Sequence, residues 1–177
     1  FIMKLKTRDI VYIGFIAALF AVATTIRIEI PGGAMVHLGS AALFTTSILF
    51  GGLYSGLGAA IGSALFDLFG GHTQYIVFSF FIKGIAGLIV GGMTAGYLPP
   101  SINKPTASFG RILVALIIGA IWTAFGYFIA WWFVLNSAAV AASKIQYSLI
   151  TSAAGIIVAI VLTPKLQKVV RRLFTKN

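Results

Sequence analysis

The sequence contains no cysteine and very few acidic residues. Only three of its 177 residues are Asp or Glu, whereas 13 are Lys or Arg. The lack of cysteine excludes disulfides, thiolate chemistry and cysteine metal ligands. The three carboxylates, Asp9, Glu29 and Asp67, make a catalytic carboxylate pair hard to assemble. We therefore predict neither an enzyme nor a bound cofactor or metal ion.

Charged residues of both signs are scarce. They make up 9% of the chain, and 59% of its residues are hydrophobic. A soluble domain carries about 25% charged residues, so this composition predicts a multi-pass membrane protein. The net charge of +10 does not indicate a nucleic-acid partner. The basic residues lie at the ends of apolar segments, where membrane topology places them.

Nucleotide-binding motifs are also missing. The sequence has no G-x-x-x-x-G-K-[ST] segment, so it cannot bind ATP through a P-loop. The stretch "GLGAAIG" at 56–62 imitates a dinucleotide fingerprint. Its third glycine comes one position late, and it lies within an apolar helical segment instead of following a strand.

Six apolar segments approach the length of about 20 residues that a membrane-spanning helix needs. Glycine- or proline-rich turns separate them, and they cover about 9–25, 37–50, 52–69, 74–96, 112–135 and 144–162. We predict an all-α membrane protein in which residues 1–177 form one bundle of six transmembrane helices. We expect Met3 to be the natural start, with no cleaved signal peptide.

The distribution of Lys and Arg predicts the orientation of this bundle. One side holds most of them: Lys4, Lys6, Arg8, Lys104, Arg111, Lys165, Lys168, Arg171, Arg172 and Lys176. The other side holds only Arg27 and Lys144. Both termini, the loop 98–111 and the basic tail 163–177 are therefore predicted to be cytoplasmic. The loops 26–36, 70–73 and 136–143 then face outward.

Polar and aromatic side chains gather in the outer halves of the predicted helices. A charged residue at bilayer depth is costly and indicates a functional site, and Lys83 is such a residue. We predict an outward-facing pocket whose substrate-binding residues are Lys83, Asp67, His37, Tyr75, Ser79, Tyr127, Trp131, Asn136, Tyr147, Ser148 and Thr151. Aromatic walls with a few fixed polar groups suit a small polar or aromatic ligand.

Several of these residues allow a second interpretation. Lys83 contacts the ligand, or it pairs only with Asp67 or extends toward the interface. Trp131 lines the pocket or belongs to the interfacial aromatic belt. His37 starts a helix more naturally than it ligates a metal.

The first apolar segment has a surface of small residues. Gly14 and Ala18, and likewise Ala17 and Ala21, are spaced four apart. Small residues at this spacing allow close helix packing in membranes. They serve internal packing or docking to another membrane subunit.

Residues 36–96 resemble the substrate-binding S components of energy-coupling factor (ECF) vitamin transporters. The similarity includes "HLG" opening the second helix, a glycine-rich third helix that ends in Asp67, and "KG" at 83–84 in the fourth. These features resemble the pyridoxine or hydroxymethylpyrimidine branch. The sequence departs from that branch at Ser40 and Ala86, where relatives often carry acids.

This resemblance implies a mechanism and partners. The chain would bind a vitamin or its precursor, of the pyridoxine or hydroxymethylpyrimidine class, beneath a lid formed by residues 26–36. It would dock through Ala17 and Ala21 onto a membrane scaffold subunit that two ATPase subunits energise, and rotate to deliver the ligand inside. The alternatives are riboflavin or another vitamin, or a stand-alone channel or facilitator for small solutes.

Overall fold

The computed structural model describes residues 6–30, 34–97 and 107–175. Within these residues the α-helices are α1 Thr7–Thr25, α2 Gly39–Phe50, α3 Gly52–Phe69, α4 Ile76–Thr94, α5 Phe109–Leu135 and α6 Ala138–Thr175. A hairpin of β1 Arg27–Ile30 and β2 Ala34–His37 joins α1 to α2, and the 3-10 helix η1 Thr73–Tyr75 precedes α4. The predicted all-α fold with six helices is confirmed.

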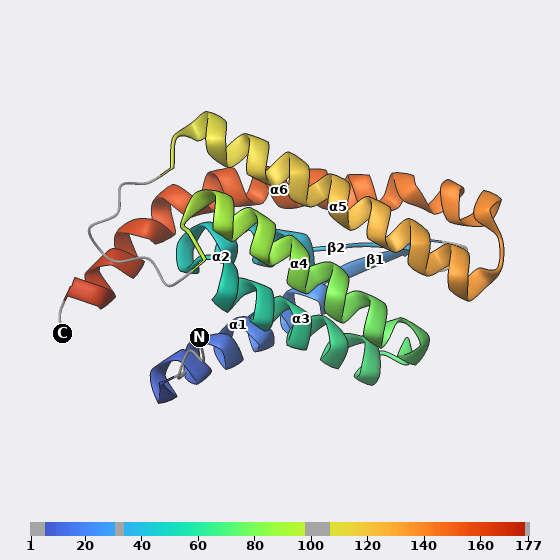
Figure 1. The fold of residues 1–177 in the computed structure, drawn as a ribbon, viewed down its shortest axis with the longest axis horizontal. Helices are drawn as coiled ribbons and strands as arrows, with labels where there is room; N and C mark the ends of the chain where they lie inside the picture. Colours follow the sequence, from blue (N-terminus) through green and yellow to red (C-terminus); the bar gives the residue numbers. More distant parts are fainter. Residues whose placement is uncertain (1–5, 31–33, 98–106, 176–177) are drawn as a thin grey trace.

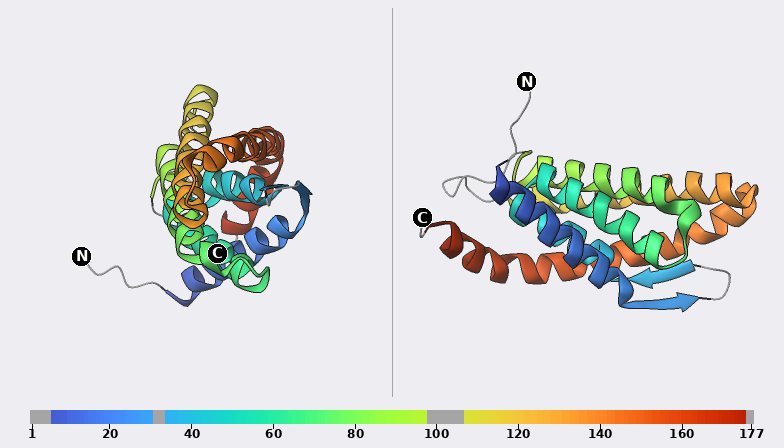
Figure 2. Two further views of the ribbon diagram at one scale, coloured as in Figure 1. Left: turned by 90° about the vertical axis from the view of Figure 1, so that its right-hand side faces the viewer. Right: turned by 90° about the horizontal axis from the view of Figure 1, so that it is seen from below.

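The helices contact one another in a closed ring in the order α1, α3, α4, α5, α6, α2. Figure 1 shows α5 and α6 along one side of the bundle and α1 and α3 along the opposite side. Figure 2 shows the same bundle end-on and from below. Five helices in the described part of the chain are long and apolar enough to cross a membrane.

Helix α2 is the exception in length. Its 12 residues extend about 18 Å, which is shorter than a bilayer core of about 30 Å. It contacts α1, α3, α4 and α6, so nearly all of its side chains are buried. The β1–β2 hairpin, which precedes α2 in the chain, extends beyond the start of α2 toward the same end of the bundle (Figure 2).

Glycines bring the backbones of α3 and α4 into contact. A Cβ atom added at Gly91 would meet the backbone of Gly51 and Gly52, and one at Gly87 would meet the backbone of Gly56. Within a bilayer the hydrophobic effect does not drive helices together. Small residues support their association because they let the two backbones approach closely. The glycine-rich face of α3 therefore packs against the glycines of α4.

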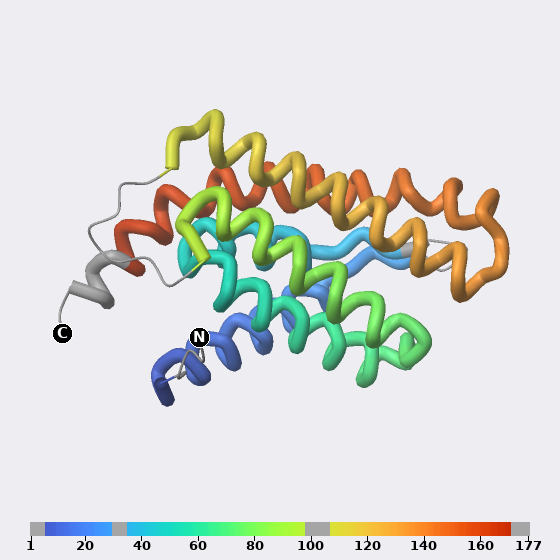
Figure 3. The backbone as a smooth tube through the Cα atoms, viewed as in Figure 1, coloured from blue at the N-terminus to red at the C-terminus, as the bar shows by residue number. Residues whose placement is uncertain are grey.

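The two ends of the bundle carry different elements. The start of α1, the α2–α3 turn and the C-terminal part of α6 lie at one end (Figure 1). We call this the basic end because it holds Lys6, Arg8, Arg111, Lys165 and Lys168. The β1–β2 hairpin, η1 and the α5–α6 turn lie at the other end, which we call the hairpin end (Figure 3).

The structure corrects the start of the sixth helix. It begins at Ala138 and not near 144, so only Asn136 and Ser137 connect α5 to α6, in place of a predicted loop over 136–143. Asn136 has a φ of 52°, a left-handed conformation that asparagine tolerates. Ser137 Oγ accepts a hydrogen bond from Val140 N–H at 3.3 Å. The alanine-rich stretch that follows favours helix.

Other boundaries shift less. α5 starts three residues earlier than predicted because Ser108 Oγ accepts a hydrogen bond from Arg111 N–H at 3.4 Å and caps the helix. The tail predicted at 163–177 continues α6 as helix through Pro164 to Thr175. Residues 98–106 of the predicted cytoplasmic loop and 176–177 of the tail lie outside the described residues.

The lid segment 26–36 forms the antiparallel hairpin, an element that the sequence did not predict. Arg27 pairs with His37 and Glu29 with Met35 in its register. Leu38 N–H also donates to the Ile26 carbonyl at 3.2 Å, which prolongs the ladder toward α1 and α2. Residues 31–33 at its tip lie outside the described residues.

We predict that Gly91→Ala destabilises the bundle. Its methyl group would overlap the backbone of α3, and overpacking of this kind costs about 1–3 kcal/mol. Thermal unfolding in detergent measures the effect. Gly14→Ala is the matched control, because nothing lies within 4 Å of a Cβ atom there. Equal melting temperatures for the two variants would contradict this account of α3–α4 packing.

Candidate ligand-binding cavity

A cavity lies between the helices at the hairpin end. Its empty volume is about 770 Å³, including the part that is open to solvent. Every helix of the bundle and strand β2 contribute to its wall. The lining residues are Phe20, Thr24, Met35, His37, Ser40, Ser63, Phe66, Asp67, His72, Tyr75, Ser79, Lys83, Thr123, Tyr127, Trp131, Ser148 and Thr151.

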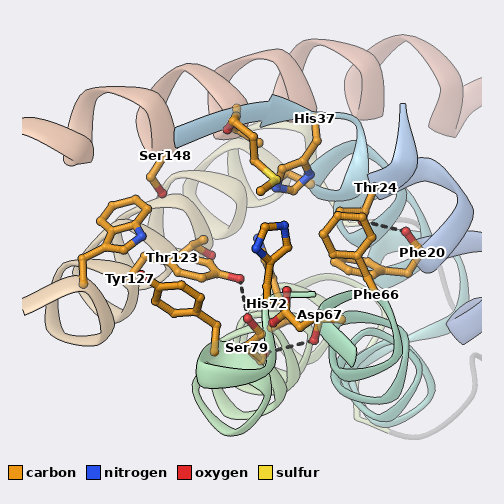
Figure 4. Close-up of a pocket in the computed structure, with 17 residues that line it drawn as sticks. Phe20, Thr24, His37, Phe66, Asp67, His72, Ser79, Thr123, Tyr127 and Ser148 are labelled. Atoms are coloured by element: carbon orange, nitrogen blue, oxygen red, sulfur yellow. Dashed lines mark hydrogen bonds between the residues drawn. The ribbon is translucent and has the colours of Figure 1, made fainter. Parts of the chain in front are cut away.

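Figure 4 shows Asp67 and Ser79, from α3 and α4, on one side of this cavity, and His37 and Ser148 across from them. The α3–α4 side is held by side-chain hydrogen bonds. Ser63 Oγ of α3 donates to the Ser79 carbonyl of α4 at 3.1 Å. The Ser79 and Tyr127 hydroxyls are 3.1 Å apart, which links α4 to α5.

Lys83 is buried in this wall. Only 2% of its surface is exposed, and its Nζ lies 5.3 Å from the centroid of the Tyr127 ring. A cation over an aromatic face is attracted by the ring quadrupole. In the described part of the chain the only ion pair within 4.0 Å joins Arg27 to Glu29. Lys83 and Asp67 therefore do not form the ion pair that the sequence allowed as an alternative.

Three residues that line the cavity each have a buried polar atom without a hydrogen-bond partner among the described residues. These atoms are Ser40 Oγ, Asp67 Oδ2 and His72 Nε2. An unpaired polar group costs free energy when it is buried, and more so when it is charged. These atoms, with the Lys83 ammonium, suit a ligand that carries both hydrogen-bond donors and acceptors.

His37 ends strand β2 directly before α2. Its Nδ1 accepts a hydrogen bond from Gly39 N–H at 3.0 Å, which leaves the proton of a neutral ring on Nε2. Burial, and then the positive charges of Lys83 and Arg27, lower the pKa of His37 to about 3. His37 is therefore uncharged at neutral pH and offers the cavity a neutral donor.

The β1–β2 hairpin closes the cavity through side-chain contacts with two helices. Thr151 Oγ1 of α6 donates to the Met35 carbonyl of β2 at 3.4 Å. The Arg27 guanidinium of β1 lies 5.2 Å from the centroid of the Phe66 ring of α3. The hairpin thus occupies the position predicted for a lid.

The structure gathers most of the predicted site residues at the cavity. Those that line it are Lys83, Asp67, His37, Tyr75, Ser79, Tyr127, Trp131, Ser148 and Thr151. It does not bring Asn136 or Tyr147 there. Asn136 forms the α5–α6 turn, and Tyr147 is not among the lining residues although it lies one helical turn before Thr151. Within the described residues, no group of His, Asp and Glu is arranged to hold a metal ion.

Sequence reasoning missed the remaining lining residues: Phe20, Thr24, Met35, Ser40, Ser63, Phe66, His72 and Thr123. Spacing contained a signal for some of them. Thr123 lies one helical turn before Tyr127, and Ser63 lies one turn before Asp67. Met35 and Ser40 gave no such signal, because a short hairpin and the start of a buried helix have no clear periodicity.

The predicted docking residues divide between two faces of α1. Ala17 is only 3% exposed and packs against α3, where a Cβ atom at Gly62 would meet the Ala17 carbonyl. Ala17 is therefore an internal packing residue, and its prediction as a docking residue is wrong. Gly14 and Ala18 are exposed, and Ala21 is partly buried.

Known proteins resemble this chain over most of its length. Residues 4–168 match the family described as "ECF-type riboflavin transporter, S component". A Pyrococcus woesei protein described as "Uncharacterized protein in gap 3'region" is 30% identical over 134 residues, covering 75% of this chain and 83% of that protein. The solved structure of the S component of a bacterial ECF transporter matches this fold with a TM-score of 0.66 at 20% sequence identity. The match covers 98% of this chain and 100% of that one.

A bundle of membrane-spanning helices around a cavity at one end has the architecture of a membrane protein that binds a solute for transport. The chain belongs to the family of ECF-type riboflavin transporter S components. It is therefore the substrate-binding, multi-pass membrane component of a transporter and not an enzyme.

We predict that the two adjacent tryptophans of α5 respond differently to lipid. Trp131 lines the cavity, whereas 52% of the Trp132 surface is exposed on the outside of the bundle. Brominated lipids, which quench tryptophan fluorescence on contact, should quench the protein through Trp132. The Trp132→Phe variant should lose most of this quenching and Trp131→Phe should keep it. The reverse order would place the cavity wall on the lipid-facing side of α5.

Proposed function

We propose that this chain captures riboflavin from outside the cell and delivers it inward together with an ECF energising module. The observation that supports a ligand of this kind is the cavity at the hairpin end. It combines aromatic walls with buried polar atoms that have no hydrogen-bond partner in the part of the chain that the structure describes. Such a wall fits a flat heteroaromatic ring with polar edges.

The family match favours riboflavin over the smaller rings. The sequence alone pointed to pyridoxine or hydroxymethylpyrimidine, with riboflavin as an alternative. The matching family is named for riboflavin. Tyr127 and Trp131, whose ring centroids are 5.6 Å apart, offer a broad aromatic surface for a tricyclic ring system.

The orientation follows from charge. The basic end carries Lys6, Arg8, Arg111, Lys165 and Lys168, and cytoplasmic segments are enriched in Lys and Arg. In this orientation both termini are cytoplasmic. The cavity and the β1–β2 hairpin then face the outside, where the vitamin is captured.

The exposed side of α1 is the proposed contact with the membrane scaffold subunit. Gly14 and Ala18 are four residues apart and both exposed, so another helix can approach their backbone closely. Two ATPase subunits bound to that scaffold would supply the energy, since this chain contains no P-loop.

We expect riboflavin to bind the purified protein and to stabilise it. Ligand at about 100 times its Kd adds about 2.7 kcal/mol to the free energy of unfolding, which a thermal shift detects. Pyridoxine and hydroxymethylpyrimidine at equal concentration should give smaller shifts. A shift with one of these two and none with riboflavin would reject riboflavin and support the smaller ring.

Lys83→Met should weaken riboflavin binding about tenfold or more, because a hydrogen bond to a charged group contributes about 1.5–3 kcal/mol. Methionine keeps the length of the side chain, and the melting temperature of the ligand-free variant checks its folding. Lys168→Met is the matched control, since Lys168 is exposed on α6 at the basic end. Unchanged affinity of Lys83→Met in a fluorescence titration would give Lys83 a purely structural role.

A further inference from the structure

Two side chains of opposite charge line the cavity from neighbouring helices and do not form an ion pair with each other. Asp67 of α3 is 7% exposed, and its Oδ2 has no hydrogen-bond partner among the described residues. Lys83 of α4 is 2% exposed, and no ion pair within 4.0 Å joins these two residues. A buried carboxylate needs a donor and a buried ammonium needs an acceptor, and the ligand is the group positioned to supply both.

The two residues are held rigidly relative to each other. Ser63 lies one turn before Asp67 on α3, and Ser79 lies one turn before Lys83 on α4. The hydrogen bond from Ser63 Oγ to the Ser79 carbonyl joins the two helices between these turns. The glycine contacts of α3 and α4 fix the same helix pair toward the basic end. A preorganised pair of this kind can select ligands by geometry.

We propose that Asp67 and Lys83 recognise the imide edge of the flavin ring system, with Asp67 Oδ2 accepting the N3–H and Lys83 Nζ donating to a neighbouring ring carbonyl. This inference rests on the proposed riboflavin function. The edge of the flavin pyrimidine ring presents a carbonyl, an N–H and a second carbonyl in a rigid row. It therefore offers one donor to the carboxylate beside an acceptor for the ammonium, and adds no charge to the cavity.

The surroundings of Lys83 favour the ring over the ribityl chain as its partner. Lys83 Nζ lies beside the Tyr127 ring, which is itself tilted against Trp131. A flavin ring that packs on this aromatic pair brings its edge next to Lys83. The Tyr127 hydroxyl already interacts with Ser79, so the Lys83 ammonium is the charged donor beside this aromatic pair.

The proposed contact gives the site a definite selectivity. Rings with a cyclic imide satisfy both charges, whereas pyridoxine and hydroxymethylpyrimidine have no imide. A site built to pair with an N–H rejects analogues that lack it, because its own buried polar group is then left unpaired. A flavin methylated at N3 should therefore bind poorly, although its aromatic surface is unchanged.

The test is a cycle of two ligands and two proteins. Riboflavin and N3-methylriboflavin are titrated against the unmodified chain and against Asp67→Ala, with flavin fluorescence as the readout. The unmodified chain should bind N3-methylriboflavin about tenfold or more weakly than riboflavin. In Asp67→Ala the two flavins should bind with nearly equal affinity, because the methyl group no longer faces a carboxylate. Asp67→Asn, which preserves the shape of the side chain, should also reduce the difference.

Asp9→Ala is the matched control. Asp9 accepts a hydrogen bond from the Tyr54 hydroxyl at 2.5 Å toward the basic end, away from the cavity. This variant should keep the full preference for riboflavin over its N3-methyl form. Lumiflavin, which lacks the ribityl chain, serves as a second probe. Its affinity relative to riboflavin should be the same in the unmodified chain and in Asp67→Ala.

The outcomes separate this inference from the proposed function. Equal affinity of the unmodified chain for the two flavins, or the same methylation penalty in Asp67→Ala, overturns imide recognition while riboflavin remains the ligand. A ribityl dependence that disappears in Asp67→Ala assigns Asp67 to the sugar chain and also overturns it. No riboflavin binding by the unmodified chain refutes the proposed substrate, and imide recognition with it.

Discussion

The backbone contact between α3 and α4 is the constraint on which the cavity depends. Gly91 lies against Gly51 and Gly52, and Gly87 lies against Gly56, so the two helices are closer than side chains would allow. This approach places Asp67 and Lys83 on one rigid wall, on either side of the hydrogen bond from Ser63 to the Ser79 carbonyl. In a bilayer, an apolar side chain gains little free energy when it exchanges contact with lipid for contact with another helix. Close packing of small residues is therefore the source of this rigidity.

Helix α2 contributes by being short. Because α2 starts well inside the bundle, space remains between its first residue and the hairpin end. The longer helices surround that space. Charged and polar side chains can then be buried without contact with lipid, where they would be most costly. Toward the basic end the interior still holds hydroxyl groups such as Ser47, Ser55 and Thr163. The buried charges Asp67 and Lys83 are confined to the cavity.

Regular patterns were predictable from the sequence, and irregular ones were not. The sequence predicted a glycine-rich helix that ends in Asp67, and it predicted a pocket in the outer half of the bundle that includes Lys83, Tyr127 and Trp131. The spacing of small residues misassigned Ala17, because two small-residue faces of α1 overlap in sequence and only packing against Gly62 distinguishes them. The hairpin escaped prediction because four-residue strands are too short for a clear alternation. The start of α6 was misplaced because alanine and serine suit both turns and helix ends.

The two strands of the hairpin hydrogen-bond to each other, and this has a mechanical consequence. Its strands pair with each other, and Leu38 N–H pairs with the Ile26 carbonyl at its base. Beyond the hairpin, the Thr151–Met35 hydrogen bond and the Arg27–Phe66 contact attach it to the helices. A displacement of the hairpin as one unit would break these attachments, including the one to the Met35 carbonyl, and would leave the β1–β2 ladder intact. Entry to the cavity then requires no unfolding of the polypeptide around it.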